Sequence, residues 1–386
     1  MIFRGVFGAC GDLVYALWIE TTMSSIHLPR DVTDYILDYL HDDPFTLMQC
    51  CLVSRSWIHC SRKHLFGQVS FNSSTLPEKW ERAFPNPLNS PAFYTRRLVV
   101  NGPRVFAKAS GKCDWTQAFS RVVELKMWSC TDNPRFHFPS QVLIILEPLC
   151  IAVAPLLPSH ILKIVRSLPL LEDLSITGSV RDDSDDACAV SQPSTSPPLT
   201  GTFQNLWTRG IGPILRELLA LPNGVRFRSI DCTWYIERDL RWIKALVDGC
   251  ADTLQYVRLH RKIIEASVAS PIDFSRATKL KEVALQLESL RDVSTVMALK
   301  TLTSDHKDLQ QISICVIIDD YYVNGFEEIH RRWMDVDRFL AQLREYTAFD
   351  TRVMYIGGEA GEGRHKRVER LFSEMMKRGI IKVEEI

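Results

Sequence analysis

Cysteine and histidine are the residues in this chain with the widest chemical scope, because both bind metals and both take part in catalysis. The chain has eleven cysteines and ten histidines, with no C-x-x-C pair and no H-E-x-x-H motif. We interpret their spacing as containing no ligand set, and we predict no metal site. Cysteines scattered without a pairing framework are typical of reduced proteins, so we expect a cytoplasmic or nuclear location.

Other motifs that carry chemistry are also weak. The glycine-rich stretch at 357–367 lacks the G-K-[ST] ending and the G-x-G-x-x-G spacing of phosphate-binding loops, so we interpret it as a turn before a terminal helix. No G-x-S-x-G nucleophile motif occurs. The segment 327–343 has acids near a histidine, but its apolar residues predict an amphipathic helix: Trp333, Val336, Phe339 and Leu340.

These observations predict a protein that is not an enzyme, with no catalytic residues and no cofactor. An enzyme whose site is assembled from dispersed residues stays an alternative. Lys+Arg and Asp+Glu both number 46, so the formal net charge is +0. Because no global field attracts nucleic acid or anionic lipid, we predict neither as a partner.

The first 22 residues are apolar, but Arg4 and Asp12 interrupt them. The longest uncharged runs there are seven residues. A membrane span needs about 18–20, and an acid in the middle of the segment is also unfavourable for a signal peptide. We therefore expect residues 1–25 to be a poorly ordered extension.

The elements that must position any functional residue begin with a helical stretch at 27–66. Leu28-Pro29 is a helix start, since proline in the first turn loses only an N–H that had no partner. Asp43-Pro44 repeats this signal, and Ser54 is placed to cap a third helix. Three short helices bury too little to be stable alone, so we predict that this stretch leans on another surface.

The ordered residues of this stretch carry a family resemblance. The segment reads LPRDV, ILDYL, LMQC, LVSRSW and LF in sequence. Over residues 26–66 it resembles an F-box, although the family usually has Glu where this chain has Asp31. The resemblance implies binding to a Skp adaptor, and through it to a cullin scaffold, with the rest of the chain presenting a protein target. It implies these adaptor-binding residues: Leu28, Pro29, Asp31, Val32, Ile36, Leu40, Val53 and Trp57.

Beyond this stretch the pattern L-x-x-L-x-L, with L any apolar residue, recurs. Its starts are Phe66, Thr95 (polar at the first position), Val122, Leu171, Phe227, Leu254, Leu280 and Leu309. Five of the seven steps are 26–29 residues long and the other two are close to twice that. A further candidate from Leu146 would divide one long step. Helical patterns at 159–168 and 237–250 lie between the strands, so the spacing indicates a leucine-rich-repeat-like solenoid.

Two features make this repeat irregular. The Asn or Cys that commonly follows the strand is present in one repeat, as Cys130. The segment 181–202 is acidic and then rich in Ser, Thr and Pro, which predicts a disordered insertion that would explain the 56-residue step. A non-repetitive α/β domain is the alternative. Four tryptophans are either partner-site anchors or core residues: Trp115, Trp128, Trp207 and Trp234.

The predicted fold class is α+β or α/β. It comprises a small three-helix F-box at 26–66, followed at 67–386 by an irregular leucine-rich-repeat-like α/β solenoid with a curved parallel sheet. This organisation resembles F-box proteins of the fungal type. The resemblance implies a substrate-receptor subunit of an SCF-type cullin-RING ubiquitin ligase. A repeat-based interaction scaffold with no link to ubiquitination, in which the N-terminal helices are an ordinary cap, is the alternative.

Overall fold

The computed structural model describes residues 29–72, 77–86, 90–101, 118–128, 158–179, 198–235, 237–262, 271–287, 293–318, 326–357, 369, 372–378 and 381–385. It combines helices with one open sheet in which every pair of neighbouring strands is parallel. This confirms the predicted α/β class with a parallel sheet. No helix within these ranges is long and apolar enough to cross a membrane.

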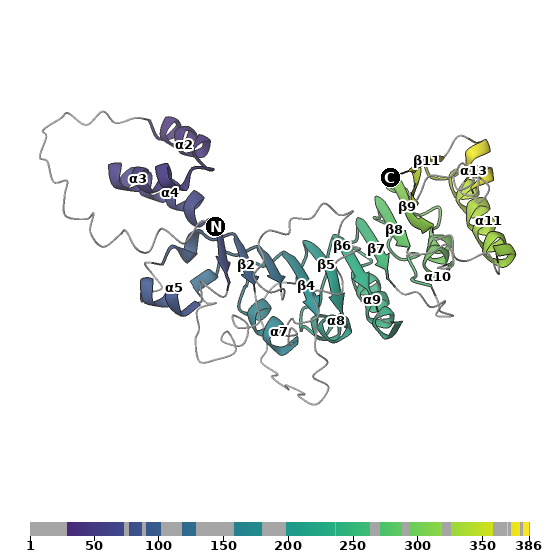
Figure 1. Ribbon diagram of the computed structural model, residues 1–386, viewed down its shortest axis with the longest axis horizontal. Helices are drawn as coiled ribbons and strands as arrows, with labels where there is room; N and C mark the ends of the chain where they lie inside the picture. The colour runs from purple at the N-terminus through teal and green to yellow at the C-terminus, as the bar shows by residue number, and fades with distance from the viewer. Residues whose placement is uncertain are drawn as a thin grey trace, which may run out of the picture.

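The sheet has eleven strands, which lie side by side in the order of the chain (Figure 1). They are β1 (Gln68–Phe71), β2 (Arg97–Asn101), β3 (Glu124–Trp128), β4 (Asp173–Ser179), β5 (Thr202–Arg209), β6 (Ser229–Trp234), β7 (Tyr256–Arg261), β8 (Glu282–Leu287), β9 (Gln311–Ile318), β10 (Asp350–Gly357) and β11 (Ile381–Glu385). Because neighbours in the chain are also neighbours in the sheet, each strand contacts the preceding and following ones.

Helices accompany the strands, and Figure 1 shows α5, α7, α8 and α9 along the same side of the sheet. They are α5 (Pro77–Ala83), η2 (Pro91–Tyr94), α7 (Pro158–Arg166), α8 (Gly212–Leu219), α9 (Glu237–Gly249), α10 (Val293–Val296), η6 (Met297–Thr301), α11 (Phe326–Leu343) and α13 (Ser373–Lys377). The helices predicted at 159–168, 237–250 and 327–343 correspond to α7, α9 and α11. Of the helix predicted after the glycine-rich turn, the structure describes α13, and most of the residues between the two lie outside the described residues.

The core of the sheet is a column of apolar side chains in register. Alternate residues of a strand point to the same face, so a constant repeat length brings equivalent positions together. None of the following is more than 3 % exposed: Val69, Leu98, Leu125, Leu174, Phe203, Ile230, Val257, Val283 and Ile312.

The turns into seven of the strands, β2 to β4 and β6 to β9, repeat the same backbone contacts. The carbonyl of Arg96 accepts hydrogen bonds from the N–H groups of Val123 and Glu124 at 2.9 and 3.1 Å. The carbonyl of Arg228 does the same for Gln255 and Tyr256 at 2.8 and 3.0 Å. These paired bonds satisfy the backbone at the turn even though the side-chain ladder of a regular repeat is missing.

The sequence pattern missed three strands, β5, β10 and β11, and two of them carry a polar residue at a buried position. In β5 the position paired with buried Ile176 is Asn205, and in β10 the position paired with Ile312 is Thr351. Both polar residues are at most 1 % exposed. A search for apolar residues therefore missed β5 and β10, and the step of 56 residues contains an additional strand, β5.

The predicted insertion at 181–202 is correspondingly shorter. Leu199 is buried and pairs with Val225 in an isolated parallel bridge, and Thr202 begins β5. Residues 180–197 lie outside the described residues, as does the candidate strand from Leu146. In the sheet, β3 pairs directly with β4.

The N-terminal stretch forms three helices, α2 (Arg30–Tyr39), α3 (Pro44–Val53) and α4 (Arg55–Phe66). The predicted caps are present. The Asp43 carboxylate accepts hydrogen bonds from the Thr46 hydroxyl at 2.6 Å and from the N–H groups of Thr46 and Phe45, both at 3.1 Å, and these bonds lower its pKa. Ser54 Oγ accepts from Ser56 N at 3.3 Å. These side chains satisfy backbone donors that would otherwise lack partners.

Candidate docking surfaces

The three helices α2, α3 and α4, here called the helical module, have a very small core. Helix α4 lies between the other two, since both α2 and α3 pack on it. Four apolar side chains of the module are buried, and three more are partly buried against them. The buried ones are Leu37, Leu47, Cys50 and Cys60, and the partly buried ones are Leu40, Trp57 and Leu65.

Most of the remaining apolar side chains of α2 and α3 face solvent. Among the residues that the structure describes, eleven large hydrophobic side chains are strongly exposed, and six of them lie on these two helices. They are Val32, Tyr35 and Tyr39 on α2, and Phe45, Leu52 and Val53 on α3, with exposed fractions from 44 % to 81 %. An apolar surface concentrated in this way is typical of a protein interaction site.

The eight predicted adaptor-binding residues fall into three groups. Pro29, Asp31, Val32 and Val53 are exposed, and Ile36, Leu40 and Trp57 are half-buried. Leu28 lies outside the described residues. The exposed members are free to contact a partner, whereas Leu40 and Trp57 also support the core of the module.

Four exposed side chains were missed by the motif: Tyr35, Tyr39, Phe45 and Leu52. The sequence of α3 contains a signal that could have identified its two missed residues, Phe45 and Leu52. Its sequence, PFTLMQCCLV, has apolar residues on every side, and a helix of that kind is expected to be covered on more than one face. In this structure α4 covers one side only.

The helical module joins the sheet without a linker. Helix α4 ends at Phe66 and β1 begins at Gln68, so only Gly67 separates them. The Phe66 ring lies 6.1 Å from the Trp80 ring and 6.4 Å from the Phe84 ring, measured between centroids. These edge contacts hold the end of α4 against α5 and the segment that follows it.

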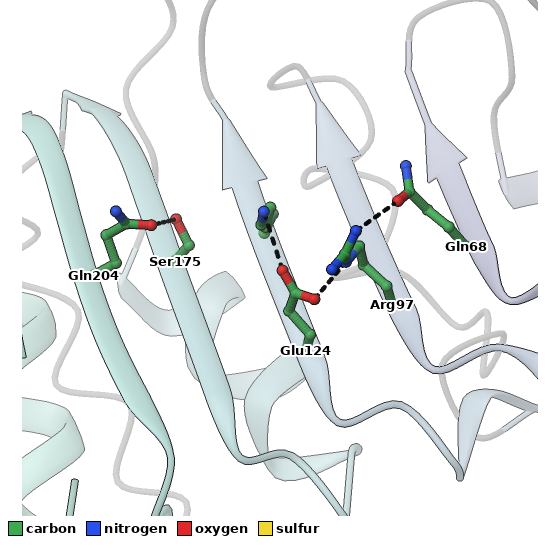
Figure 2. A network of polar contacts seen from close by, with 6 residues as sticks. Gln68, Arg97, Glu124, Ser175 and Gln204 are labelled. Carbon is green, nitrogen blue, oxygen red and sulfur yellow. Dashed lines mark hydrogen bonds and ion pairs between the residues drawn. The ribbon is translucent and has the colours of Figure 1, made fainter. Parts of the chain in front are cut away.

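A second candidate surface is the polar face of the sheet, where the side chains between the buried apolar positions lie. Figure 2 shows Gln68, Arg97 and Glu124 in contact across β1, β2 and β3. Arg97 donates to Glu124 and, at 3.2 Å, to Gln68. Lys126 Nζ lies 3.0 Å from Glu124. Burial raises the pKa of Glu124, but hydrogen bonds and charge from Arg97 and Lys126 outweigh it and hold the pKa below its usual range.

The polar contacts continue across the middle of the sheet. Ser175 donates to Gln204 at 3.4 Å (Figure 2), and Gln204 donates to Asp231 at 3.5 Å. Arg258 lies 3.7 Å from Asp231. Burial raises the pKa of Asp231, and the Arg258 charge offsets only part of that rise. The face therefore alternates positive and negative groups with no dominant sign.

Aromatic side chains stand on the same face. Trp128 and Tyr256 are 39 % and 42 % exposed, and each lies two residues from a charged residue of the polar row, Lys126 and Arg258 respectively. Trp234 is buried and belongs to the core. Trp115 and the side chain of Trp207 lie outside the described part of the chain. Trp128 and Tyr256 are therefore the aromatic anchors available on this face.

One group of side chains contradicts the expectation that cysteine and histidine are never combined at ligand spacing. Cys60 and His64 are four residues apart on α4, and Asp38 of α2 faces them. Their donor atoms lie within 4.8 Å of one another. The spacing of Cys60 and His64, four residues apart in a predicted helix, was a signal for this pair. Asp38 is too far away in the chain to be associated with them by spacing.

Comparison with known proteins gives no family assignment. No protein-family model matches the chain, and no curated protein matches it significantly. Any function must therefore be argued from the residues and surfaces described above.

Proposed function

We propose that this protein is a substrate-receptor subunit of an SCF-type ubiquitin ligase. The observation that best supports this proposal is the concentration of exposed apolar side chains on α2 and α3. These helices lie in a segment whose sequence resembles an F-box. The module would bind a Skp adaptor and, through it, a cullin scaffold. No catalytic residue of this chain enters the proposal.

The energetics of the module support a partner. Four fully buried apolar side chains are a small core for three helices, and a chain of this size is marginal alone. Burying one Val or Leu side chain contributes about 1.5–3 kcal/mol. An adaptor that covered Val32, Leu52 and Val53 would therefore add to the stability of the module as well as bind it.

We further propose that the sheet and its helices are an irregular leucine-rich-repeat-like solenoid whose polar face holds the protein target. The repeated backbone contacts at the strand entrances and the in-register apolar column support this interpretation. The alternating charges suit a target of mixed charge, with Trp128 and Tyr256 as anchors. Ubiquitin transfer would then be favoured by effective concentration, since the target and the charged enzyme are held on one scaffold.

Co-purification with a Skp adaptor tests the first part. The double variant Val32→Asp with Val53→Asp places charges on the exposed faces of α2 and α3 without touching the buried core. We expect it to weaken adaptor binding by at least about tenfold, which is a loss of roughly 1.4 kcal/mol. The matched control is Leu170→Asp, which alters a side chain of similar exposure outside the module.

Equal retention of the adaptor by the double variant and the control would overturn the ligase proposal. It would favour the alternative of an interaction scaffold in which the module only caps the sheet. One observation fits that alternative, since α4 packs on η2 and β1 at the end of the sheet. The His59 and Tyr94 rings, 5.2 Å apart, are part of this contact.

A further inference from the structure

Three chemically different donor atoms meet between α2 and α4. His64 Nε2 lies 2.8 Å from Asp38 Oδ1 and 3.9 Å from Cys60 Sγ. The imidazole therefore stands between the carboxylate and the thiol. Because Cys60 and His64 are one helical turn apart, their side chains leave α4 on the same face, and that face is the one on which α2 packs.

We propose that Asp38, Cys60 and His64 form a binding site for a zinc ion. Sulfur, imidazole nitrogen and carboxylate oxygen are the donors that Zn²⁺ takes in proteins, and soft thiolate together with imidazole disfavours Mg²⁺ and Ca²⁺. With metal–ligand bonds of about 2.0–2.3 Å, tetrahedral coordination separates neighbouring donor atoms by about 3.3–3.6 Å. The observed 2.8 and 3.9 Å lie on either side of that range. The third pair, the Asp38 carboxylate and Cys60 Sγ, lies within 4.8 Å, so side-chain shifts of up to about 1 Å bring the three donors to tetrahedral spacing.

The three proposed ligands differ in how far their side chains are exposed to solvent. Cys60 is 7 % exposed, and the side chains of His64 and Asp38 are 16 % and 59 % exposed. The two inner donors are thus held by the packing of α4, while the outer carboxylate is open to solvent. An ion could enter past Asp38, and the fourth position would be left for water or for a further carboxylate.

Asp34 precedes Asp38 by one turn of α2, but it lies 3.7 Å from Arg30 in an ion pair. It would have to leave that pair to take the fourth position, so water is the simpler fourth ligand. Zn²⁺ binds the thiolate form of cysteine, so the Cys60 proton would leave to solvent on binding, and binding should strengthen as the pH rises.

The ion would join two helices that otherwise share a small apolar contact. Leu37 of α2 and Leu40, the residue that follows the helix, belong to the same small apolar cluster as Cys60 of α4. A metal bond between them would hold α2 in place, and metal binding to a folded site is also folding free energy. This inference is independent of the adaptor proposal, because it uses Asp38, which contacts α4, and none of the exposed apolar side chains of α2.

The test is a titration of the full-length reduced protein, first with Co²⁺ and then with Zn²⁺. Cobalt bound to a thiolate gives a sulfur-to-metal charge-transfer band that a carboxylate and imidazole pair does not give. We expect this band with the intact chain, displacement of cobalt by Zn²⁺, and a higher melting temperature with Zn²⁺. Cys60→Ser should lose the band. Asp38→Asn, which alters an exposed side chain, should weaken binding by more than about tenfold, the loss that even an outer-shell partner can cause.

The matched controls lie in the same module. Cys51→Ser and His41→Gln remove a half-buried cysteine and an exposed histidine that are not in the cluster, and both variants should titrate like the intact chain. If Cys60→Ser fails to fold, the Asp38→Asn result decides. A charge-transfer band that survives unchanged in Asp38→Asn and His64→Gln would overturn the proposal. So would a chain that shows no band, in which case Asp38 and His64 are only an ion pair beside a buried cysteine.

Discussion

The buried amide of Asn205 connects β5 to the end of β6. Its side chain is fully buried in register with Ile176 of β4 and Cys232 of β6. There it donates a hydrogen bond of 2.7 Å to the Thr233 carbonyl and a weaker one of 3.7 Å to Cys232 Sγ. Burial raises the pKa of the Cys232 thiol to about 12, so the thiol stays neutral. A polar residue is tolerated here because the strand end supplies an acceptor for it.

Asn205→Ala should lower the free energy of unfolding by about 1–3 kcal/mol, because the Thr233 carbonyl loses its donor and a cavity remains. The control is Gln204→Ala, one residue earlier on the polar face, where the hydrogen bonds are long and near solvent. Urea unfolding followed by tryptophan fluorescence measures both. Similar stabilities for the two variants would contradict the role assigned to Asn205.

Glu124 makes a pH-dependent contribution to stability. Its pKa is lower in the folded protein than in the unfolded chain. The stabilisation is therefore complete above the ordinary glutamate pKa of about 4.3 and is lost as the pH falls through the lower, folded-state value. Glu124→Gln should cost about 0.5–1 kcal/mol at neutral pH, since Arg97 and Lys126 are partly exposed and their attraction is screened.

The measurement is the difference in unfolding free energy between the intact chain and Glu124→Gln across a pH series. This difference should be constant near neutral pH and should shrink at acid pH. Glu345→Gln removes a carboxylate whose ion pair with Arg378 lies away from the polar row and serves as the control. A difference for Glu124→Gln that grows as the pH falls would contradict the assigned direction of the pKa shift.

At the scale of the elements, the turn between β4 and β5 depends on a close backbone approach. A Cβ atom placed on Gly201 would lie 2.7 Å from the Glu172 carbonyl oxygen and would also contact the Asp173 carboxylate. The Gly201 N–H donates to the same carbonyl at 3.1 Å. This turn starts the strand that the sequence pattern missed.

Gly201→Ala should destabilise the protein by about 1–3 kcal/mol, because the two strands must separate to admit the methyl group. Gly249→Ala is the matched control, since its added Cβ would meet only Leu219 Cδ2 at an ordinary 3.5 Å. Thermal unfolding by circular dichroism compares the two variants. If the melting temperature of Gly201→Ala equals or exceeds that of Gly249→Ala, the close approach is not needed for stability.

Helices and strands were predictable to different degrees. The helix starts at Asp43 and Ser54 could be predicted from the sequence, because a cap acts on N–H groups only two or three residues away. Strands β5 and β10 could not be predicted from the spacing of apolar residues, because the polar residues Asn205 and Thr351 occupy buried positions in them. The partner that satisfies Asn205 lies on the next strand, beyond the reach of a local pattern.

At the scale of the whole molecule, the single residue between α4 and β1 ties the helical module to the sheet. On the proposed function, this junction fixes the target relative to the ligase. A Gly/Ser segment of about six residues inserted after Gly67, which would span roughly 13 Å, should reduce ubiquitin transfer to the target that co-purifies with the intact chain. Adaptor binding should be unchanged, because the exposed faces of α2 and α3 are untouched.

A reconstituted ubiquitination assay and an adaptor pull-down measure the two effects separately. The same segment inserted after Lys307, in an exposed turn before β9, is the control for insertion as such. Undiminished transfer to the target would show that a rigid junction is not required. Loss of adaptor binding would show instead that the insertion disturbs the module, contrary to the expectation.

The sequence alone was sufficient for the features that depend on near neighbours in the chain. Helix caps depend on residues only two or three positions away. The amphipathic faces of α9 and α11 and most of the apolar column follow from periodicities of 3.6 and 2, which are also local properties. They define the α/β class and the parallel sheet. The tertiary structure alone decided three other features. They are the exposed apolar faces of the helical module, the polar row across the sheet and the contact of Asp38 with Cys60 and His64. Each depends on which distant residues approach one another, and a local pattern marks a side chain as apolar or charged without determining what covers it.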